Sequence, residues 1–499
     1  MCAMLSDEPL CRSHCGAPIV TVIALSTYAA CWVVGAESGQ QGSGGSPTRP
    51  AGVCELYAPG HFGNSYEVMG INEMKRVLVE ARHWGFNRYG DWFDTLDCAD
   101  PFIEQNRYAL GGALWERKKA HFRTAQSLGL PCDLILTPNH VYTNQLREEW
   151  LAARTPRIFG QLVCPGNPEA RKAILDNHDK WFADLARSGV RLSSLSACPY
   201  DYGGCACKAC EPWILTFVKL CRDIHAMALK HHPGVEMHFI GWWWSGQEHA
   251  LFAEWVDREA PGWAKSVALH IPYDKTGVAD VPLPKGCEKR AFVHIGYADR
   301  DKPEDTYGHL GPVIAPNRLP KTVDNLRSQG VVGVMAYSEG VFDDVNKALL
   351  AGLFSGRYPN GQAVLEAYAE RYFAAQGNQT KEWASWLAGW GDPFHRDAPL
   401  ALKELDGLSG DKADWRRRQW ELKARMFTAH QAIMREKQWT PQRLAHVDEF
   451  WSAQEEIHRG LWGLAPLRHI FGRTFTPVSW YADWAMHQAQ SAGKPGDPQ

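Results

Sequence analysis

The chain has 499 residues, of which 45% are hydrophobic, and a formal net charge of -3. This length is sufficient for one large barrel of ~250 residues together with a second domain. The near-neutral charge, without a basic stripe along the sequence, argues against a nucleic acid as the partner.

The amino-terminal segment predicts a secretory signal peptide over residues 1–36. An apolar run, 17–36, follows basic residues and ends in Val34-Gly35-Ala36, a small-residue pattern that signal peptidase accepts. A transmembrane anchor is the alternative, because the run approaches the ~20 residues of a span. Polar residues interrupt it, and a lipid anchor at Cys31 is not favoured. We therefore expect a secreted or periplasmic protein without a stable membrane span.

The next two segments predict a flexible linker and a (β/α)8 TIM barrel. Residues 37–50 are rich in Gly, Ser and Gln, and this composition cannot bury enough apolar surface to become ordered. Residues 51–357 alternate short apolar or β-branched runs with helical periods. The eight predicted strands are residues 53–58, 86–92, 132–138, 192–198, 235–242, 266–271, 291–297 and 331–337.

Amphipathic helices are expected between most of these strands. The predicted helices are residues 71–84, 114–128, 169–188, 212–231, 246–258 and 321–328. A glycine in a left-handed conformation commonly ends a helix, and the glycines expected in this role are Gly85, Gly129, Gly189, Gly234 and Gly330. Residues 273–289 are rich in Pro, Gly and charge, so the helix there is expected to be short or missing.

The pattern beyond the last strand is helical. Asp343 and Asp344 lie in the first turn of a helix, where negative charge complements the macrodipole, so a capping role is expected. Residues 358–499 predict a separate helical C-terminal domain, with helices at 363–375, 415–437 and 441–461, and a disordered tail after residue 492. Tryptophans at helical spacing are expected in its core, namely Trp383, Trp386, Trp390 and Trp420.

The predicted strand ends carry acidic and aromatic residues. In this fold, a residue at the carboxyl end of a strand points into the active site. The hydroxyls of a polyhydroxylated substrate pair with carboxylates and amides, and its ring faces stack on tryptophan. The predicted substrate-binding residues are Arg88, Asp91, Asn139, His140, Tyr200, Trp242, Trp244, Glu248, Tyr273, Tyr297 and Tyr337.

Two acids at these ends form the predicted catalytic pair. Glycosidic hydrolysis needs one protonated carboxyl and one ionised carboxylate. Asp201 is the expected acid, since Tyr200 and the aromatic wall desolvate it, and Glu339 is the expected base or nucleophile. Strands four and eight lie across a barrel from each other, which favours the wider spacing of inverting chemistry. As alternatives, Asp201 caps the following helix, and Glu339 pairs with Lys347 or Arg357.

Cys205, Cys207 and Cys210 follow Asp201 closely in the sequence. They can bind a metal if Cys198, Cys164 or a histidine completes a tetrahedron. A secreted chain favours a disulfide, so we rank a disulfide first and a structural zinc second. No other cofactor is predicted.

Two segments resemble secreted bacterial glycoside hydrolase-type barrels. They are Pro199-Tyr200-Asp201-Tyr202-Gly203-Gly204-Cys205-Ala206-Cys207, and Tyr337-Ser338-Glu339-Gly340 followed by Asp343-Asp344-Val345-Asn346-Lys347. The similarity is loosely to glycoside hydrolase families 20, 67, 84 and 163, over Cys54 to Pro359. It implies a glycan substrate and acid catalysis from the end of strand four. Family 20 enzymes pair adjacent Asp and Glu there, whereas Tyr202 follows Asp201 here, so acetamido-assisted hydrolysis is not implied.

The sequence therefore predicts a secreted glycoside hydrolase that cleaves a poly- or oligosaccharide by two-carboxylate chemistry. One alternative is a barrel that binds glycans without cleaving them. Another is a metal-dependent hydrolase that uses the cysteine-rich loop.

Overall fold

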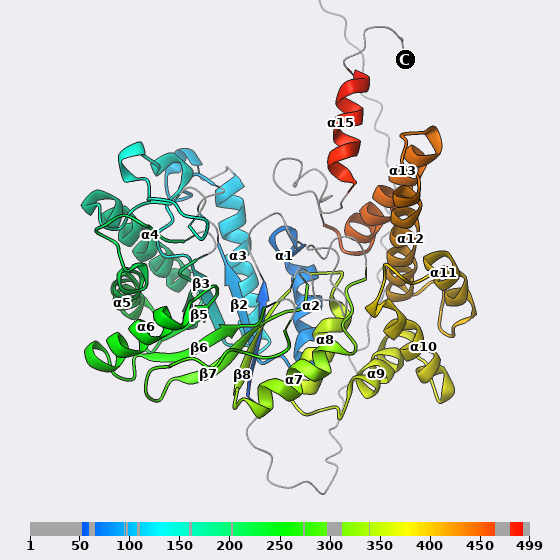
Figure 1. Cartoon of the computed structure of the whole chain (residues 1–499), viewed down its shortest axis with the longest axis horizontal. Helices are drawn as coiled ribbons and strands as arrows, with labels where there is room; N and C mark the ends of the chain where they lie inside the picture. Colours follow the sequence, from blue (N-terminus) through cyan, green and yellow to red (C-terminus); the bar gives the residue numbers. More distant parts are fainter. Residues whose placement is uncertain are drawn as a thin grey trace, which may run out of the picture. The chain divides into compact units, whose positions relative to one another are not determined.

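Eight parallel strands form a closed barrel in the computed structural model, in the order β1 to β8, with β8 paired to β1 (Figure 1). The strands are β1 (Val53–Ala58), β2 (Arg88–Trp92), β3 (Cys132–Leu136), β4 (Leu192–Ala197), β5 (Glu236–Gly241), β6 (Ala264–His270), β7 (Glu288–His294) and β8 (Gly333–Tyr337). The predicted fold class is confirmed, and each predicted strand overlaps an observed one.

The structure describes residues 52–58, 65–93, 95, 98–106, 110–158, 162–200, 203–272, 275–296, 312–338, 340–464 and 480–492. The predicted signal peptide, linker and disordered tail lie outside these residues. None of the described helices has the length and hydropathy that crossing a membrane requires.

Helices connect the strands and cover the barrel. They are α1 (Ser65–Val68), α2 (Ile71–Trp84), α3 (Leu110–Ser127), α4 (Pro168–Arg187), α5 (Trp213–His231), α6 (Gly246–Glu259), α7 (Arg318–Ser328) and α8 (Asp344–Phe354). All five glycines expected to end helices have positive φ, which confirms their left-handed role. The described residues between β6 and β7 contain no helix, as expected from their composition.

Charged and polar side chains fill the barrel interior at the amino-terminal ends of the strands. Arg88 Nη1 donates to Ser194 Oγ at 3.3 Å, and His238 Nδ1 lies 2.7 Å from Ser266 Oγ. Burial, and then the neighbouring Asp133 carboxylate, raise the pKa of Glu55 well above its usual value. A Cβ at Gly90 would lie 2.2 Å from Glu55 Oε1, so a larger residue there would displace the Glu55 carboxyl group. This end of the barrel is therefore closed by packed side chains.

The chain continues beyond the barrel as helices. They are α9 (Gly361–Phe373), α10 (Asn378–Ala388), α11 (Ala398–Gly407), α12 (Trp415–Arg435), α13 (Pro441–Glu455) with a π-helical turn at Glu456–Leu461, and α15 (Tyr481–Ala492). They lie within the region predicted to be helical, although the sequence analysis gave no bounds for α10, α11 or α15. The tryptophans predicted as core are all buried, which confirms that assignment.

Asp343 and Asp344 do not serve mainly as helix caps, contrary to expectation. The side chain of Asp343 makes no capping hydrogen bond, and instead it pairs with Lys347 and accepts from Ser338 Oγ at 2.5 Å. Asp344 binds Lys423 and Arg416 of α12 at 2.7 and 3.1 Å. Both acids are neutralised by buried cations, and Asp344 links the barrel helix α8 to α12.

Candidate functional site at the barrel mouth

A circle of aromatic side chains occupies the barrel interior at the carboxyl ends of the strands. Alternation along each strand places every second side chain inside. The ring centroids of Tyr57 and Tyr337 are 5.4 Å apart, those of Phe292 and Tyr337 are 5.9 Å apart, and those of Trp242 and Phe292 are 5.5 Å apart. Trp92 of β2 belongs to the same apolar cluster. The mouth therefore has an apolar, aromatic floor above the polar interior.

Two histidines complete this circle of aromatic side chains, and neither was predicted as a site residue. The rings of His270 and His294 lie 4.1 and 5.1 Å from that of Trp242. Burial lowers the pKa of His270 to about 4, and it lowers the pKa of His294 well below its usual value. Both imidazoles are therefore neutral near pH 7, and the floor carries no cationic charge from them. The sequence could have indicated them, because each histidine ends a strand at a position where the alternation of side chains points inward.

Trp243 is the exposed aromatic residue at the end of β5. Its side chain is 42% exposed, and its ring stacks on that of Trp242 with centroids 6.2 Å apart and planes at 24°. Its φ of 61° lies in the left-handed region, which costs a residue with a side chain about 1–2 kcal/mol. Trp243 is not among the predicted substrate-binding residues, although its chain neighbours Trp242 and Trp244 are.

Tyr200 and Glu248, both predicted to bind substrate, are hydrogen-bonded to each other. The Tyr200 hydroxyl donates to Glu248 Oε1, and Arg157 Nη2 lies 3.0 Å from Glu248 Oε2. The Arg157 guanidinium lies 3.9 Å from the centre of the Tyr200 ring. Burial alone would raise the pKa of Glu248, but hydrogen bonds from Ser245, Tyr200 and Arg157 hold it below its usual value. The Glu248 carboxylate therefore stays ionised. It connects the β3–α4, β4–α5 and β5–α6 loops through Arg157, Tyr200 and Ser245.

Asn139 connects the β3–α4 and β4–α5 loops. Its Nδ2 donates to the carbonyl oxygens of Val163 at 2.9 Å and Gly204 at 2.8 Å, and its Oδ1 accepts from Gly204 N at 2.9 Å. These backbone groups engage the amide of Asn139, and its contact with substrate stays a prediction. His140 is buried beside Trp92, with ring centroids 6.4 Å apart, so it lies next to the circle of aromatic side chains.

Three other predicted substrate-binding residues lie away from the mouth. Arg88 begins β2 and therefore lies at the opposite, amino-terminal end of the barrel. Asp91 points outward and forms a buried ion pair with Lys118 of α3 at 2.6 Å. Trp244 packs on the outer side against Phe252 of α6, with centroids 5.0 Å apart. Arg88 lies at the wrong end of its strand for a contact at the mouth, and the side chains of Asp91 and Trp244 point away from the barrel interior.

Four predicted site residues lie outside the part of the chain that the structure describes, namely Asp201, Glu339, Tyr273 and Tyr297. Their roles remain predictions. One alternative partner considered for Glu339, Lys347, pairs with Asp343 and also donates to the Gly340 carbonyl. The other, Arg357, donates to the carbonyl oxygen of His83.

The cysteine cluster contains a fourth thiol from another loop. Cys164 lies with Cys205, Cys207 and Cys210 so that all four sulfurs are within 4.8 Å of one another. All four are free thiols, so the disulfide ranked first is not found here. Cys164 was one of three candidates for the fourth position in the sequence.

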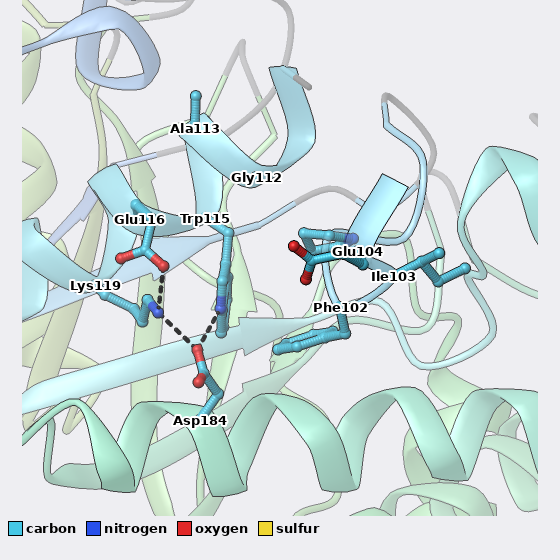
Figure 2. A pocket seen from close by; sticks show the side chains of 10 residues that line it. Phe102, Ile103, Glu104, Gly112, Ala113, Trp115, Glu116, Lys119 and Asp184 are labelled. Atoms are coloured by element: carbon cyan, nitrogen blue, oxygen red, sulfur yellow. Dashed lines mark hydrogen bonds and ion pairs between the residues drawn. The ribbon is translucent and has the colours of Figure 1, made fainter. Parts of the chain in front are cut away.

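A pocket of about 510 Å³ lies outside the barrel mouth, between α3 and α4. In it, Lys119 Nζ lies 2.8 Å from Glu116 and 2.7 Å from Asp184, and the Trp115 indole donates to Asp184 at 2.8 Å (Figure 2). Phe102 and Glu104 line its other side. The polar groups of Lys119 and Asp184 are thus engaged with each other, and none of the lining residues ends a barrel strand.

Comparisons with known proteins show a distant fold likeness. No family model matches the chain, and no curated protein matches it. The pneumococcal virulence factor StrH, described for N-glycan recognition and hydrolysis, is 13% identical, with a TM-score of 0.39 over 81% of this chain and 98% of that one. A family 138 glycoside hydrolase that targets pectin rhamnogalacturonan II is 10% identical, with a TM-score of 0.42 over 88% of this chain and 67% of that one.

A third solved structure, the endo-1,4-beta-mannanase of Rhizomucor miehei, is 10% identical, with a TM-score of 0.42 over 64% of this chain and 99% of that one. At these scores the likeness identifies neither a family nor a substrate.

Proposed function

We propose that this protein is a secreted glycoside hydrolase whose saccharide binds at the barrel mouth. The observation that carries the proposal is the aromatic floor formed by Tyr57, Trp242 and Tyr337, with the exposed Trp243 beside it. The CH groups of a sugar ring are attracted to the negative face of such rings. The mouth is also where enzymes of this fold keep their chemistry.

The proposed chemistry uses Asp201 as the acid and Glu339 as the base or nucleophile. Their chain neighbours support this assignment. Tyr200, directly before Asp201, is buried and bound to Glu248. Ser338, directly before Glu339, donates its backbone N–H to the carbonyl oxygen of Tyr57 at 3.2 Å. Both acids therefore follow residues that are fixed at the carboxyl ends of β4 and β8.

A screen for new reducing ends tests the proposal. Purified full-length protein is incubated with plant, algal and host glycans, and released sugars are measured. Cleavage of a glycosidic bond is the expected result. Binding of a glycan without release of sugar from any substrate would favour the non-catalytic barrel instead.

A replacement of Trp243 tests its role in saccharide binding separately from its effect on folding stability. In Trp243→Gly, the left-handed backbone is relaxed while the exposed ring is lost. We expect the free energy of unfolding to stay within about 1 kcal/mol of the parent. The affinity for the saccharide should fall about tenfold, which corresponds to about 1.4 kcal/mol.

Calorimetric titration and thermal unfolding of the same samples provide both readouts. Trp243→Phe is the matched control, because it keeps an aromatic face at the same position and should retain most of the affinity. Unchanged affinity in Trp243→Gly would place the saccharide elsewhere.

A further inference from the structure

Four cysteines from two loops bring their sulfurs together above the barrel. Cys164 lies in the β3–α4 loop, and Cys205, Cys207 and Cys210 lie in the β4–α5 loop. The sulfur of Cys164 is 3.6 Å from that of Cys207 and 3.5 Å from that of Cys210. Sulfurs bound to one tetrahedral zinc at 2.3 Å are separated by about 3.8 Å. The cluster therefore already has nearly the size of a zinc-tetrathiolate site.

From this geometry we propose that Cys164, Cys205, Cys207 and Cys210 bind a single structural zinc ion. All four ligands come from the protein, so the coordination shell is closed and no position remains for water or substrate. This arrangement opposes the metal-dependent hydrolase considered from the sequence, which requires an open position. The site does not depend on the proposed glycosidase function.

The backbone around the cluster is fixed independently of any metal. Cys164 N donates to the Trp150 carbonyl at 2.7 Å, and Cys210 N donates to the Cys207 carbonyl at 2.9 Å. Ala206 N donates to the Ala153 carbonyl at 2.9 Å, which holds one cysteine loop against the other. The thiols are thus presented by ordered turns, and little further ordering is needed for binding.

Burial distinguishes the ligands from one another. Cys205 and Cys210 are buried, whereas Cys164 and Cys207 are partly exposed, so the cluster is not fully enclosed. A Cβ at Gly166 would lie 3.3 Å from Cys164 Sγ and 3.5 Å from Cys210 Sγ, so glycine leaves room beside the sulfurs. Asn139 joins the same two loops through Val163 and Gly204. Bound zinc would connect the two loops a second time, through cysteines that follow the proposed acid, Asp201, in the sequence.

Metal analysis of the purified full-length protein tests the proposal. We expect stoichiometric zinc, and intense visible absorption of tetrahedral cobalt thiolate after exchange with Co²⁺. Cys207→Ser should lose the bound zinc and unfold at a lower temperature. Cys287→Ser is the control, because Cys287 is a partly exposed free thiol outside the cluster and its replacement should leave the zinc content unchanged.

Thiol counting on wild-type protein keeps the test decisive if Cys207→Ser does not fold. With zinc bound, the four thiols are protected from alkylation, and they react after chelation. Protein that lacks zinc, does not take up cobalt, or shows the mass loss of a disulfide among these cysteines would overturn the proposal. Each readout is independent of hydrolytic activity, so failure of the proposed function would not affect it.

Discussion

Replacing Asp344 with asparagine should lower the free energy of unfolding by about 3–5 kcal/mol. Asp344 lies 2.7 Å from Lys423 Nζ and 3.1 Å from Arg416 Nη1, and it accepts from the Tyr368 hydroxyl. The Lys423 side chain is 0% exposed, and that of Asp344 is 12% exposed. Asn keeps the shape but removes the carboxylate that pairs directly with both buried cations. Removing one partner of a buried pair is costly for this reason.

The same network predicts a loss of stability in acid. Burial would raise the pKa of Asp344, but Lys423 and Arg416 lower it to about 2. An unfolded aspartate has a pKa of about 3.9, so the contribution of Asp344 is present above that value. It is lost as the pH falls from about 4 to about 2. Denaturant unfolding of parent and Asp344→Asn across this range should show their difference shrinking.

Asp406→Asn is the matched control. Asp406 pairs with Lys412, and these side chains are 78% and 68% exposed. An exposed pair contributes at most about 1 kcal/mol. Equal losses in Asp344→Asn and Asp406→Asn would contradict the account of the buried network.

Glu339→Gln and Asp201→Asn should each reduce the turnover number about 10²–10⁴-fold, if the proposed function is correct. Each change removes a carboxyl needed either to protonate the leaving oxygen or to activate the attacking group. The affinity for the saccharide should persist, because the aromatic floor is unchanged. Release of reducing ends and calorimetric binding, measured on the same samples, separate the two effects.

Asp324→Asn serves as the control for these variants. Asp324 lies on α7 with a side chain that is 78% exposed, away from the strand ends. Its replacement should leave turnover unchanged. Full activity in both Glu339→Gln and Asp201→Asn would exclude two-carboxylate catalysis by this pair.

The barrel was predictable because its local signals agree with one another. The strand β1 has the predicted bounds, 53–58, and α2 has the predicted bounds, 71–84. Apolar runs, helical periods and helix-ending glycines recur in the same order along the chain. The number of residues between the segments then leaves few arrangements other than a closed parallel barrel.

The site was less predictable because strand phase decides where a side chain points. Asp91 is one residue before the inward-facing Trp92, and it therefore meets Lys118 outside the barrel. The turn at Trp243 similarly separates the inward Trp242 from the outward Trp244. A shift of one position exchanges the two faces of a strand, and residue types alone do not specify it.

Contacts between residues that are far apart in the sequence were also not predictable. Asn139 binds the backbone at Val163 and Gly204, far along the chain, and nothing in its neighbours indicates these bonds. Cys164 was considered beside Cys198 as a fourth ligand, and only the fold places it against Cys207 and Cys210. Such pairs follow from the loop paths, which local propensities do not determine.

In the proposed function, a saccharide binds and is cleaved at the barrel mouth. A crystal structure of Glu339→Gln with an oligosaccharide that the parent cleaves tests it most directly. We expect a sugar ring against Trp243 and Trp242, with Asp201 and position 339 on either side of the glycosidic oxygen. A sugar found only in the pocket between α3 and α4, or acids that face away from the mouth, would contradict it.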